Sequence, residues 1–538
     1  MSTDDLWLPA SAGTSRRTFL AGTLGMAAAT IGLSACAAAT TGKKSYSGGP
    51  TSAGRISRGG TLRVGALTNG SVETISPLTT IGISDFIRLF SLYDPLFLPG
   101  PNGTTIPALA ESATPSADAK TWTFHLRRGV VWHNGKDFNA DDVVYTIQHS
   151  WGDKANVFNA VLATIVDFGK ARKIDDYTVE IVLKVAIADF TSVTCFPNCY
   201  IVQAGTKDFS NGNGTGPFTL KTFKPGSYSL FDANKNYWRH GGPYLDSLVV
   251  DSTYISDQSR LNALLANAID VAPGVPPALA QANARTGRIV LGNQPGPGFV
   301  GPVMRVDRGT LKNPVIRQAL KLIPDRDQFV SNVYQGYASL SNDAPGFTDR
   351  YWASDLTQHQ DIDKAKSLLK SAGASDLKLT LKTSGVVPGQ SDTATLLQQQ
   401  AKTAGVTINV QRYTPAEFYT PQAGFFTRDF SVTFFSTGVN SLAVFYLSSM
   451  VPAGPYNESH FGGDPTASKL VFDAIGEVDE GKARDKWHAV QEQQVKDGPY
   501  IIPATNNWLD AYGTKVRGAK TTNAFSCNYY DFSSTWLT

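Results

Sequence analysis

The sequence predicts an α/β protein of two or three lobes, and three observations lead to this fold class. The chain has 538 residues. Domains usually have about 100–200 residues, so the chain is too long for one simple core. Residues 119–133 alternate apolar and polar side chains, as a half-buried strand does. Residues 361–412 show helix and strand patterns in turn. The sequence therefore predicts mixed helices and strands, with part of the sheet parallel.

The first elements follow from these patterns in order. A short strand at Thr61–Gly65 begins the folded part of the chain. Trp122, Phe124 and Leu126 alternate with polar residues, which predicts a strand, a turn at Gly129 and then a second strand. Asn134-Gly135 supplies the next turn.

A helix is expected after this turn. Asn139 is its predicted N-cap, and Asp141 and Asp142 would lie in the first turn, where acidic side chains are favourable. The apolar residues of this segment recur at helical spacing, which predicts a buried face made of Val143, Val144 and Ile147.

The strongest α/β signal lies in the second half of the chain. Asp361 to Ala372 has helical spacing and stops at Gly373, a residue that favours helix C-termini. An alternating strand at residues 377–381, a helix over 392–404 ending at Gly405, and a strand at 406–410 follow. Strand, helix and strand within about 35 residues predict a βαβ unit.

Charge and composition narrow the function classes. Lys and Arg number 48 and Asp and Glu 45, for a formal net charge of +3. This balance gives no reason to propose a nucleic-acid partner. The chain has 9 Trp, 20 Tyr and 28 Phe, and composition alone leaves open whether they form core or a recognition cleft.

The first 35 residues are predicted to be a signal peptide. Arg16 and Arg17 precede a short apolar run, Ala21–Ala35, which is too short for the roughly 20 residues of a membrane-spanning helix. The arginine pair resembles a twin-arginine export signal. Leu33–Cys36 resembles a bacterial lipobox, which would make Cys36 the lipidated N-terminus after cleavage. The alternative is an Ala-rich tail with a free cysteine.

The anchored form has a predicted place in the cell. Residues 36–57 would be a lipid-anchored tether, since they are rich in small and polar residues. The protein would then be held at the outer face of the cytoplasmic membrane. No later stretch approaches 18 uninterrupted apolar residues.

The sequence lacks the common hydrolase, zinc-binding and phosphate-binding motifs. It contains no Gly-x-Ser-x-Gly, and none of its seven His residues lies in a His-Glu-x-x-His pattern. The loop from Gly129 to Asp137 has the wrong length and no Ser or Thr for a phosphate loop, and a strand rather than a helix follows Gly212–Gly216. We therefore expect no catalytic residue, no metal and no cofactor.

The four cysteines are too few for a disulfide scaffold. Cys195 and Cys199 have three alternatives: a disulfide, a metal pair or two free thiols. A Cys195–Cys199 disulfide is the prediction, with Cys527 free and buried. A bridge from Cys527 to either of the others is the rival.

Five segments carry a family resemblance. Together they resemble the family 5 extracellular solute-binding proteins, the oligopeptide- and dipeptide-binding components of ABC importers. The segments stand in the family's order, and the first resembles its signature region almost position by position. They are Thr121–Tyr145, Gly214–Phe218 continuing to Asn236–Trp238, Val315–Leu320 with Asp325-Arg326, Lys364–Gly373, and Tyr500–Pro503.

The resemblance implies a periplasmic-binding-protein-like type II fold. Two main lobes would meet at a hinge, and an inserted segment would form a third lobe. The expected first lobe is 58–84, 212–296 and 502–538, the inserted lobe 85–211 and the opposing lobe 297–501. The hinge would be the two crossing segments near 296 and 502. Such a protein closes around its ligand and delivers it to a membrane permease, while a separate subunit hydrolyses ATP. We expect a monomer with no enzyme activity.

The substrate prediction rests on a departure from the family. In peptide-binding members, the Asp of a Trp-x-x-Asp stretch clamps the peptide α-ammonium. Here Phe435 falls on the Trp and Gly438 on the Asp. A buried ammonium without a counter-charge costs several kcal/mol, so the departure argues against ordinary recognition of a free peptide N-terminus. Either another acid reaches the site, or the ligand is neutral or N-blocked, such as a modified peptide or a neutral oligosaccharide.

The candidate ligand-lining residues come from several parts of the chain, and each has packing as its alternative role. The signature residues Trp122, Trp132, Gly135, Trp238 and Arg317 are expected to specify the fold instead. The rival functions are a secreted α/β hydrolase and a lipoprotein sensor that imports nothing. The candidate lining residues are Asn69, Gly70, Tyr93, Phe435, Ser436, Gly438, Asn440 and Trp508.

Overall fold

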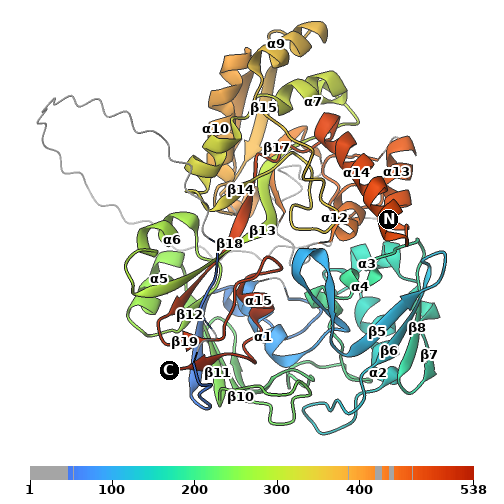
Figure 1. Cartoon of the computed structure of the whole chain (residues 1–538), viewed down its shortest axis with the longest axis vertical. Helices are drawn as coiled ribbons and strands as arrows, with labels where there is room; N and C mark the ends of the chain where they lie inside the picture. The colour runs from blue at the N-terminus through green and yellow to red at the C-terminus, as the bar shows by residue number, and fades with distance from the viewer. Residues whose placement is uncertain are drawn as a thin grey trace, which may run out of the picture. The chain divides into compact units, whose positions relative to one another are not determined.

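The computed structural model describes residues 46–51, 54–80, 82–385, 387–418, 427–435, 441–462 and 465–538. Its main feature is a 12-stranded sheet, with ten strands in the order β16-β15-β17-β13-β18-β12-β2-β11-β10-β9 (Figure 1). Two short strands, β1 (Ser47–Gly48) and β14 (Ala338–Leu340), pair with β13 and β18. The ten are β2 (Thr61–Leu67), β9 (Phe218–Lys224), β10 (Tyr228–Ala233), β11 (Ser247–Tyr254), β12 (Val271–Ala272), β13 (Ile289–Met304), β15 (Lys378–Thr383), β16 (Thr407–Arg412), β17 (Phe430–Phe435) and β18 (Ala504–Gly513).

The predicted parallel pairing is confirmed. Strands β15 and β16 run parallel, and so do β2 and β11. Helix α9 (Ile362–Ser371) precedes β15, and helix α10 (Gln390–Ala401) connects β15 to β16. Gly373 and Gly405 have positive φ values of 68° and 79°, the left-handed conformation expected at both helix ends. Each predicted element of this region is present within a few residues of its expected bounds.

The two longest strands, β13 and β18, pair antiparallel at the centre of the sheet order. Their register shifts between Pro295 and Phe299, where the sequence reads Pro-Gly-Pro-Gly. Proline has no N–H to donate to the ladder, so it interrupts the pairing. A Cβ on Gly296 would lie 2.7 Å from the backbone oxygen of Asn506, so only glycine allows this close approach.

A second sheet has the order β5-β6-β8-β7. The predicted strand at 121–126 is confirmed as β6, with Trp122, Phe124 and Leu126 buried. The prediction of a second strand after Gly129 is wrong. Only an isolated bridge joins Val131 to Asp137, because the chain reverses at once: the N–H of Trp132 donates to the carbonyl of Lys136 at 2.8 Å. The other strands of this sheet are β5 (Ala110–Pro115), β7 (Arg172–Asp175) and β8 (Thr178–Val182). Two separate two-stranded sheets pair β3 (Phe97–Pro99) with β4 (Thr105–Pro107) and β19 (Val516–Arg517) with β20 (Trp536–Leu537).

The predicted N-cap at Asn139 is confirmed for helix α2 (Ala140–Tyr145). The Asn139 side chain accepts from the N–H of Asp141 at 2.8 Å, and the N–H of Asn139 donates to Asp142 Oδ2 at 3.0 Å. This reciprocal pair is a capping box. The remaining helices are α1 (Ile83–Leu92), α3 (Asn159–Ile165), α4 (Phe190–Val193), α5 (Asp257–Leu265), α6 (Pro277–Asn283), α7 (Pro314–Lys321), α8 (Arg326–Gln328), α11 (Pro415–Phe418), α12 (Leu442–Ser449), α13 (Pro465–Ile475), α14 (Glu480–Asp497) and α15 (Cys527–Tyr530).

The buried apolar residues form several clusters. One joins the second sheet to α12, α13 and α14, one surrounds β2, β11 and α1, and one lies around β15–β17 with α7, α9 and α10. Within the described ranges, no helix has both the length and the hydropathy needed to cross a membrane. Arg16, Arg17 and Cys36 lie outside the described residues, so the export and lipidation predictions stay predictions.

The predicted Cys195–Cys199 disulfide is wrong, and so is the rival bridge to Cys527. All three residues are free, buried thiols. The Cys195 thiol donates to the carbonyl of Thr191 at 3.3 Å, and both Cys195 and Cys199 pack in the apolar cluster of the second sheet. The prediction that Cys527 is free and buried is confirmed.

The signature residues act as scaffold, as expected. The indole N–H of Trp132 donates to Asp142 at 3.0 Å, and that of Trp238 donates to Asp94 at 2.9 Å. Arg317 donates to the carbonyl of Asp497 at 2.7 Å. These bonds satisfy polar groups of the scaffold, and those of Trp238 and Arg317 connect distant parts of the chain.

Candidate functional site

A cavity of about 300 Å³ lies where β13, β17 and β18 meet α5 and the start of α6. This size falls at the lower end of small-molecule sites. Its walls come from segments far apart in the sequence. They are Leu67, Ile83, Asp257, Arg260, Gly274–Pro277, Phe299, Val300, Val333, Tyr334, Val387–Gly389, Phe434, Phe435 and Asn506–Leu509.

Most of the cavity wall is apolar, and aromatic rings support it. Phe435, at the end of β17, packs edge-on against Phe445 of α12 at a centroid distance of 4.3 Å. It also stacks on Phe299 of β13 at 6.0 Å. Tyr500 packs edge-on against both Phe299 and Phe445, so this wall is fixed by interlocking rings. The wall favours a ligand with apolar groups.

Two charged residues line the cavity, and they neutralise each other. Arg260 donates to Asp257 Oδ1 at 2.6 Å, one turn apart on α5. The Arg260 side chain is only 1% exposed, and it also donates to the carbonyls of Pro273 and Gly274 at 2.6 and 3.1 Å. The guanidinium is therefore held by the turn before α6, and its charge is offset by Asp257.

Strand β18 supplies the polar part of the wall through Asn506, Asn507 and Trp508. Asn507 donates to Asn293 of β13 at 2.7 Å, but its Oδ1 has no hydrogen-bond partner within the described residues. The indole Nε1 of Trp508 also has none there, although the side chain is 91% buried. Buried polar groups are nearly always hydrogen-bonded, so each of these two atoms lacks a bond that such a group normally makes.

The family assignment rests on a sequence match. Residues 104–454 match the model of the bacterial extracellular solute-binding proteins, family 5 middle region. The chain belongs to this family. The dipeptide-binding protein of Escherichia coli is 32% identical over 342 residues, which are 57% of this chain and 62% of that protein. The glutathione-binding protein of Pectobacterium atrosepticum is 24% identical over 443 residues, 80% of this chain and 85% of that protein.

Solved structures agree with the expected fold. The periplasmic binding protein DppA of Helicobacter pylori, solved with the peptide STSA, aligns with a TM-score of 0.74 at 21% identity. The alignment covers 90% of this chain and 99% of that one. The expectation of a type II periplasmic-binding-protein fold is confirmed. The match covers 62% of the E. coli relative, which is less than two thirds of its length. This likeness alone therefore does not assign a substrate to the chain.

The structure brings two of the predicted lining residues together. Phe435 and Trp508 both line the cavity. Tyr93 does not, because it is 2% exposed and packs in the cluster around β2 and α1, where burial raises the pKa of its hydroxyl. Ser436, Gly438 and Asn440 lie outside the described residues, so the substitution at Gly438 keeps its sequence-based interpretation.

Asn69 and Gly70 lie just beyond the end of β2 and are not part of the cavity wall. The N–H of Asn69 donates to Glu73 Oε1 at 3.1 Å. Glu73 is fully buried and paired with Arg88 at 2.7 Å, and the guanidinium holds the pKa of Glu73 low against the effect of burial. The packing role, which was the alternative for these two residues, is the one their contacts favour.

Asp257, Arg260, Asn506 and Asn507 were missed from the sequence. The spacing of Asp257 and Arg260 is an i, i+3 pair of a helix, which usually marks a solvated surface. Asn506 and Asn507 are consecutive amides in a largely buried strand, and their place directly before Trp508 was the available signal.

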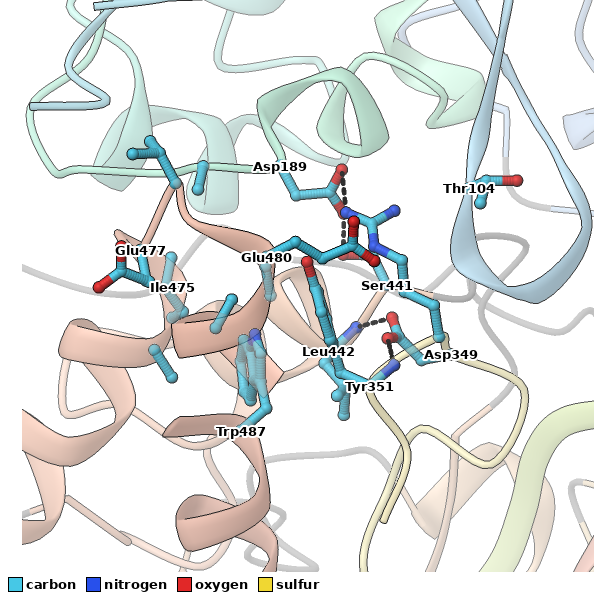
Figure 2. Close-up of a pocket in the computed structure, with 16 residues that line it drawn as sticks. Thr104, Asp189, Asp349, Tyr351, Ser441, Leu442, Ile475, Glu477, Glu480 and Trp487 are labelled. Atoms are coloured by element: carbon cyan, nitrogen blue, oxygen red, sulfur yellow. Dashed lines mark hydrogen bonds and ion pairs between the residues drawn. The ribbon is translucent and has the colours of Figure 1, made fainter. Parts of the chain in front are cut away.

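A second pocket, of about 390 Å³, is acidic (Figure 2). Asp189, from the segment before α4, pairs with Arg350 at 3.6 Å. Asp349 accepts from the N–H groups of Tyr351 and Leu442 at 2.8 and 3.0 Å. Burial raises the pKa of Asp349 to about 7, and the pKa of Asp189 is raised for the same reason.

These contacts join the predicted inserted and opposing lobes. The hydroxyl of Ser192 donates to that of Ser441 at 3.0 Å, and the N–H of Ala188 donates to the carbonyl of Ile475 at 2.8 Å. The hydroxyl of Ser441 also lies within hydrogen-bond distance of Asp189 Oδ2, at 3.3 Å (Figure 2). The pocket's carboxylates are engaged within the protein, so we interpret it as a contact region between two segments.

Proposed function

We propose that this protein captures an extracytoplasmic solute, a peptide or peptide-like molecule, and delivers it to the permease of an ABC importer. The observation that carries the proposal is the cavity between β13, β17 and β18. Its walls come from both predicted main lobes and from the strands that connect them. A ligand there touches both sides, so its binding energy favours a closed arrangement. Family membership supports a transport role without catalysis.

The proposed hinge consists of the crossing strands near residues 296 and 502. The register shift between Pro295 and Phe299 supports it, because fewer ladder hydrogen bonds resist bending there. The first lobe would be 58–84, 212–296 and 502–538, and the opposing lobe 297–501. Residues 85–211 would be the inserted lobe, and they contain the separate second sheet of β5 to β8.

The cellular setting is proposed from the sequence. Arg16 and Arg17 would direct export, and lipidation of Cys36 would hold the monomer at the outer face of the cytoplasmic membrane. The partners would be the permease and its ATPase subunit. Closure would present the loaded form to the permease.

The test is the melting temperature of the purified protein with three ligand panels: free dipeptides and tripeptides, N-blocked peptides, and neutral oligosaccharides. A ligand at about 100 times its dissociation constant adds roughly 2.7 kcal/mol. With an unfolding entropy near 1 kcal/mol/K for about 500 residues, the expected rise is about 2–3 °C.

A matched pair of variants places the effect in the cavity. Phe435→Ala removes a ring from the cavity wall, while Phe472→Ala removes a comparably half-buried ring elsewhere against the same apolar cluster. The rise should disappear in the first variant and persist in the second. Equal rises in both variants, or no rise with any panel, would refute the proposal. A rise confined to oligosaccharides would replace the peptide substrate with a sugar.

A further inference from the structure

Within this proposed function, we propose that the cavity selects an uncharged, apolar solute and that Asn506 and Trp508 of β18 recognise an amide group in it. The ligand class is an N-blocked, C-amidated hydrophobic dipeptide or a molecule of the same chemistry. A free dipeptide, with its ammonium and carboxylate, would bind more weakly.

The charges of the cavity give the first argument. Its described lining contains one cation and one anion, Arg260 and Asp257, paired at 2.6 Å. Arg260 is also fixed by two backbone carbonyls. A ligand ammonium or carboxylate would have to compete with this pair or remain uncompensated, and a buried, unpaired charge is costly.

The polar groups of β18 give the second argument. Trp508 is 91% buried, its indole N–H has no partner within the described residues, and it can only donate. The carboxamide of Asn506 is half-buried and lines the same cavity, and it can both donate and accept. Asn506 and Trp508 are two residues apart on β18, so their side chains share one face of the strand. An indole donor beside a carboxamide is the complement of an amide, whose oxygen accepts and whose N–H donates.

Two glycines of β13 allow its backbone to lie close to these polar groups. A Cβ on Gly298 would lie 2.8 Å from Asn506 Oδ1 and 3.2 Å from the carbonyl oxygen of Phe435. A Cβ on Gly296 would lie 3.1 Å from the indole nitrogen of Trp508. Any larger residue would therefore crowd both polar side chains. Gly296 and Gly298 therefore place no side chain of β13 against Trp508 and Asn506.

The apolar wall completes the match. Phe299, Phe435 and Val300 stand on the β13–β17 side, and Val275 and Pro276 stand on the α6 side. Two aliphatic or aromatic ligand side chains would bury their surface there, while the amide between them reaches β18.

The experiment compares two ligands that differ only in charge, Leu-Leu and N-acetyl-Leu-Leu-amide, by isothermal titration of the purified protein. We expect the blocked dipeptide to bind at least about tenfold more tightly. Asn506→Ala and Trp508→Phe should each weaken it by about 5- to 10-fold, the value of one hydrogen bond.

Matched controls keep the variants interpretable. Asn409→Ala removes an exposed carboxamide from strand β16, and Trp536→Phe removes another buried indole N–H without a partner within the described chain. Neither residue lines the cavity, so both variants should bind like the wild type. The melting temperature of each unliganded variant checks its folding.

The outcomes separate the inference from the proposed function. If Leu-Leu binds as tightly as its blocked form, the inference is overturned and peptide capture stands. If the β18 variants bind like their controls, the assigned recognition residues are wrong. If neither dipeptide binds, the inference is overturned, and the oligosaccharide and tripeptide panels then decide whether the proposed function fails with it.

Discussion

Arg260→Met is the substitution that most directly tests the charge balance of the cavity. Methionine is similar in length but removes the guanidinium that pairs with Asp257 at 2.6 Å. The carboxylate of Asp257, whose side chain is 26% exposed, would then line the cavity without its partner. It would then act as a counter-charge for a peptide ammonium. The sequence lacks such a carboxylate at Gly438.

The expected change in affinity follows from the bond that Asp257 would make to the ligand ammonium in place of Arg260. A hydrogen bond between charged groups contributes about 1.5–3 kcal/mol. At 1.4 kcal/mol per tenfold, the affinity for Leu-Leu relative to N-acetyl-Leu-Leu-amide should rise by about 10- to 150-fold. The variant also loses the bonds from Arg260 to Pro273 and Gly274, so its stability should fall.

The assay is the affinity ratio of the two ligands, measured by titration at a temperature where the variant is folded. Arg63→Met is the control, since Arg63 pairs with Asp270 at 3.0 Å outside the cavity wall. The ratio should change in Arg260→Met and remain at the wild-type value in Arg63→Met. An unchanged ratio in a folded Arg260→Met protein would refute the reasoning from paired charges.

Three further predictions concern stability and thiol chemistry. Arg88→Met should lower the free energy of unfolding in urea by about 3–5 kcal/mol, because Glu73 would remain buried without its partner at 2.7 Å. Asp349 has a pKa of about 7 in the fold and 3.8 as the ordinary value, so the folded state holds its proton more tightly. Its contribution should lower stability as pH rises from about 4 to 7, by about 4 kcal/mol in total, and Asp349→Asn should flatten that slope. Alkylation of the denatured, unreduced protein should label Cys195 and Cys199, since both are free thiols.

Each of these predictions has a contrary result. Arg172→Met breaks an exposed pair with Glu180 and should cost less than about 1 kcal/mol, so an equal loss in Arg88→Met would contradict the buried network. A pH slope that is the same in wild type and Asp349→Asn would place the titration elsewhere. If Cys195 and Cys199 react only after reduction, the two residues form a disulfide and the finding of free thiols is wrong.

Local signals in the sequence were sufficient for much of the fold. Asn139 caps its helix because its side chain and that of Asp142 satisfy N–H groups within one turn. Gly373 and Gly405 end their helices because each adopts a positive φ that other residues disfavour. The strand predicted after Gly129 does not form, because only four residues separate Gly129 from the next turn.

The site was less predictable because it depends on contacts between distant segments. Phe435 was found through its place in the family pattern, whereas Trp508 was named as a candidate without a motif. Arg260 was missed, because an arginine on a short polar helix looks solvated until the turn at Pro273 and Gly274 covers it. The spacing of Cys195 and Cys199 says nothing about the direction of their thiols, so the bridge could not be decided from it.

Photo-crosslinking tests the central claim most directly. A blocked dipeptide that carries a benzophenone side chain would be irradiated with the purified protein, and the labelled residues mapped by mass spectrometry. We predict saturable labelling of Phe299, Phe434, Phe435 and the 506–509 segment, suppressed by excess N-acetyl-Leu-Leu-amide. Saturable labelling confined to Tyr351 and the other residues of the acidic pocket, or no saturable labelling at all, would contradict the assignment of the ligand site.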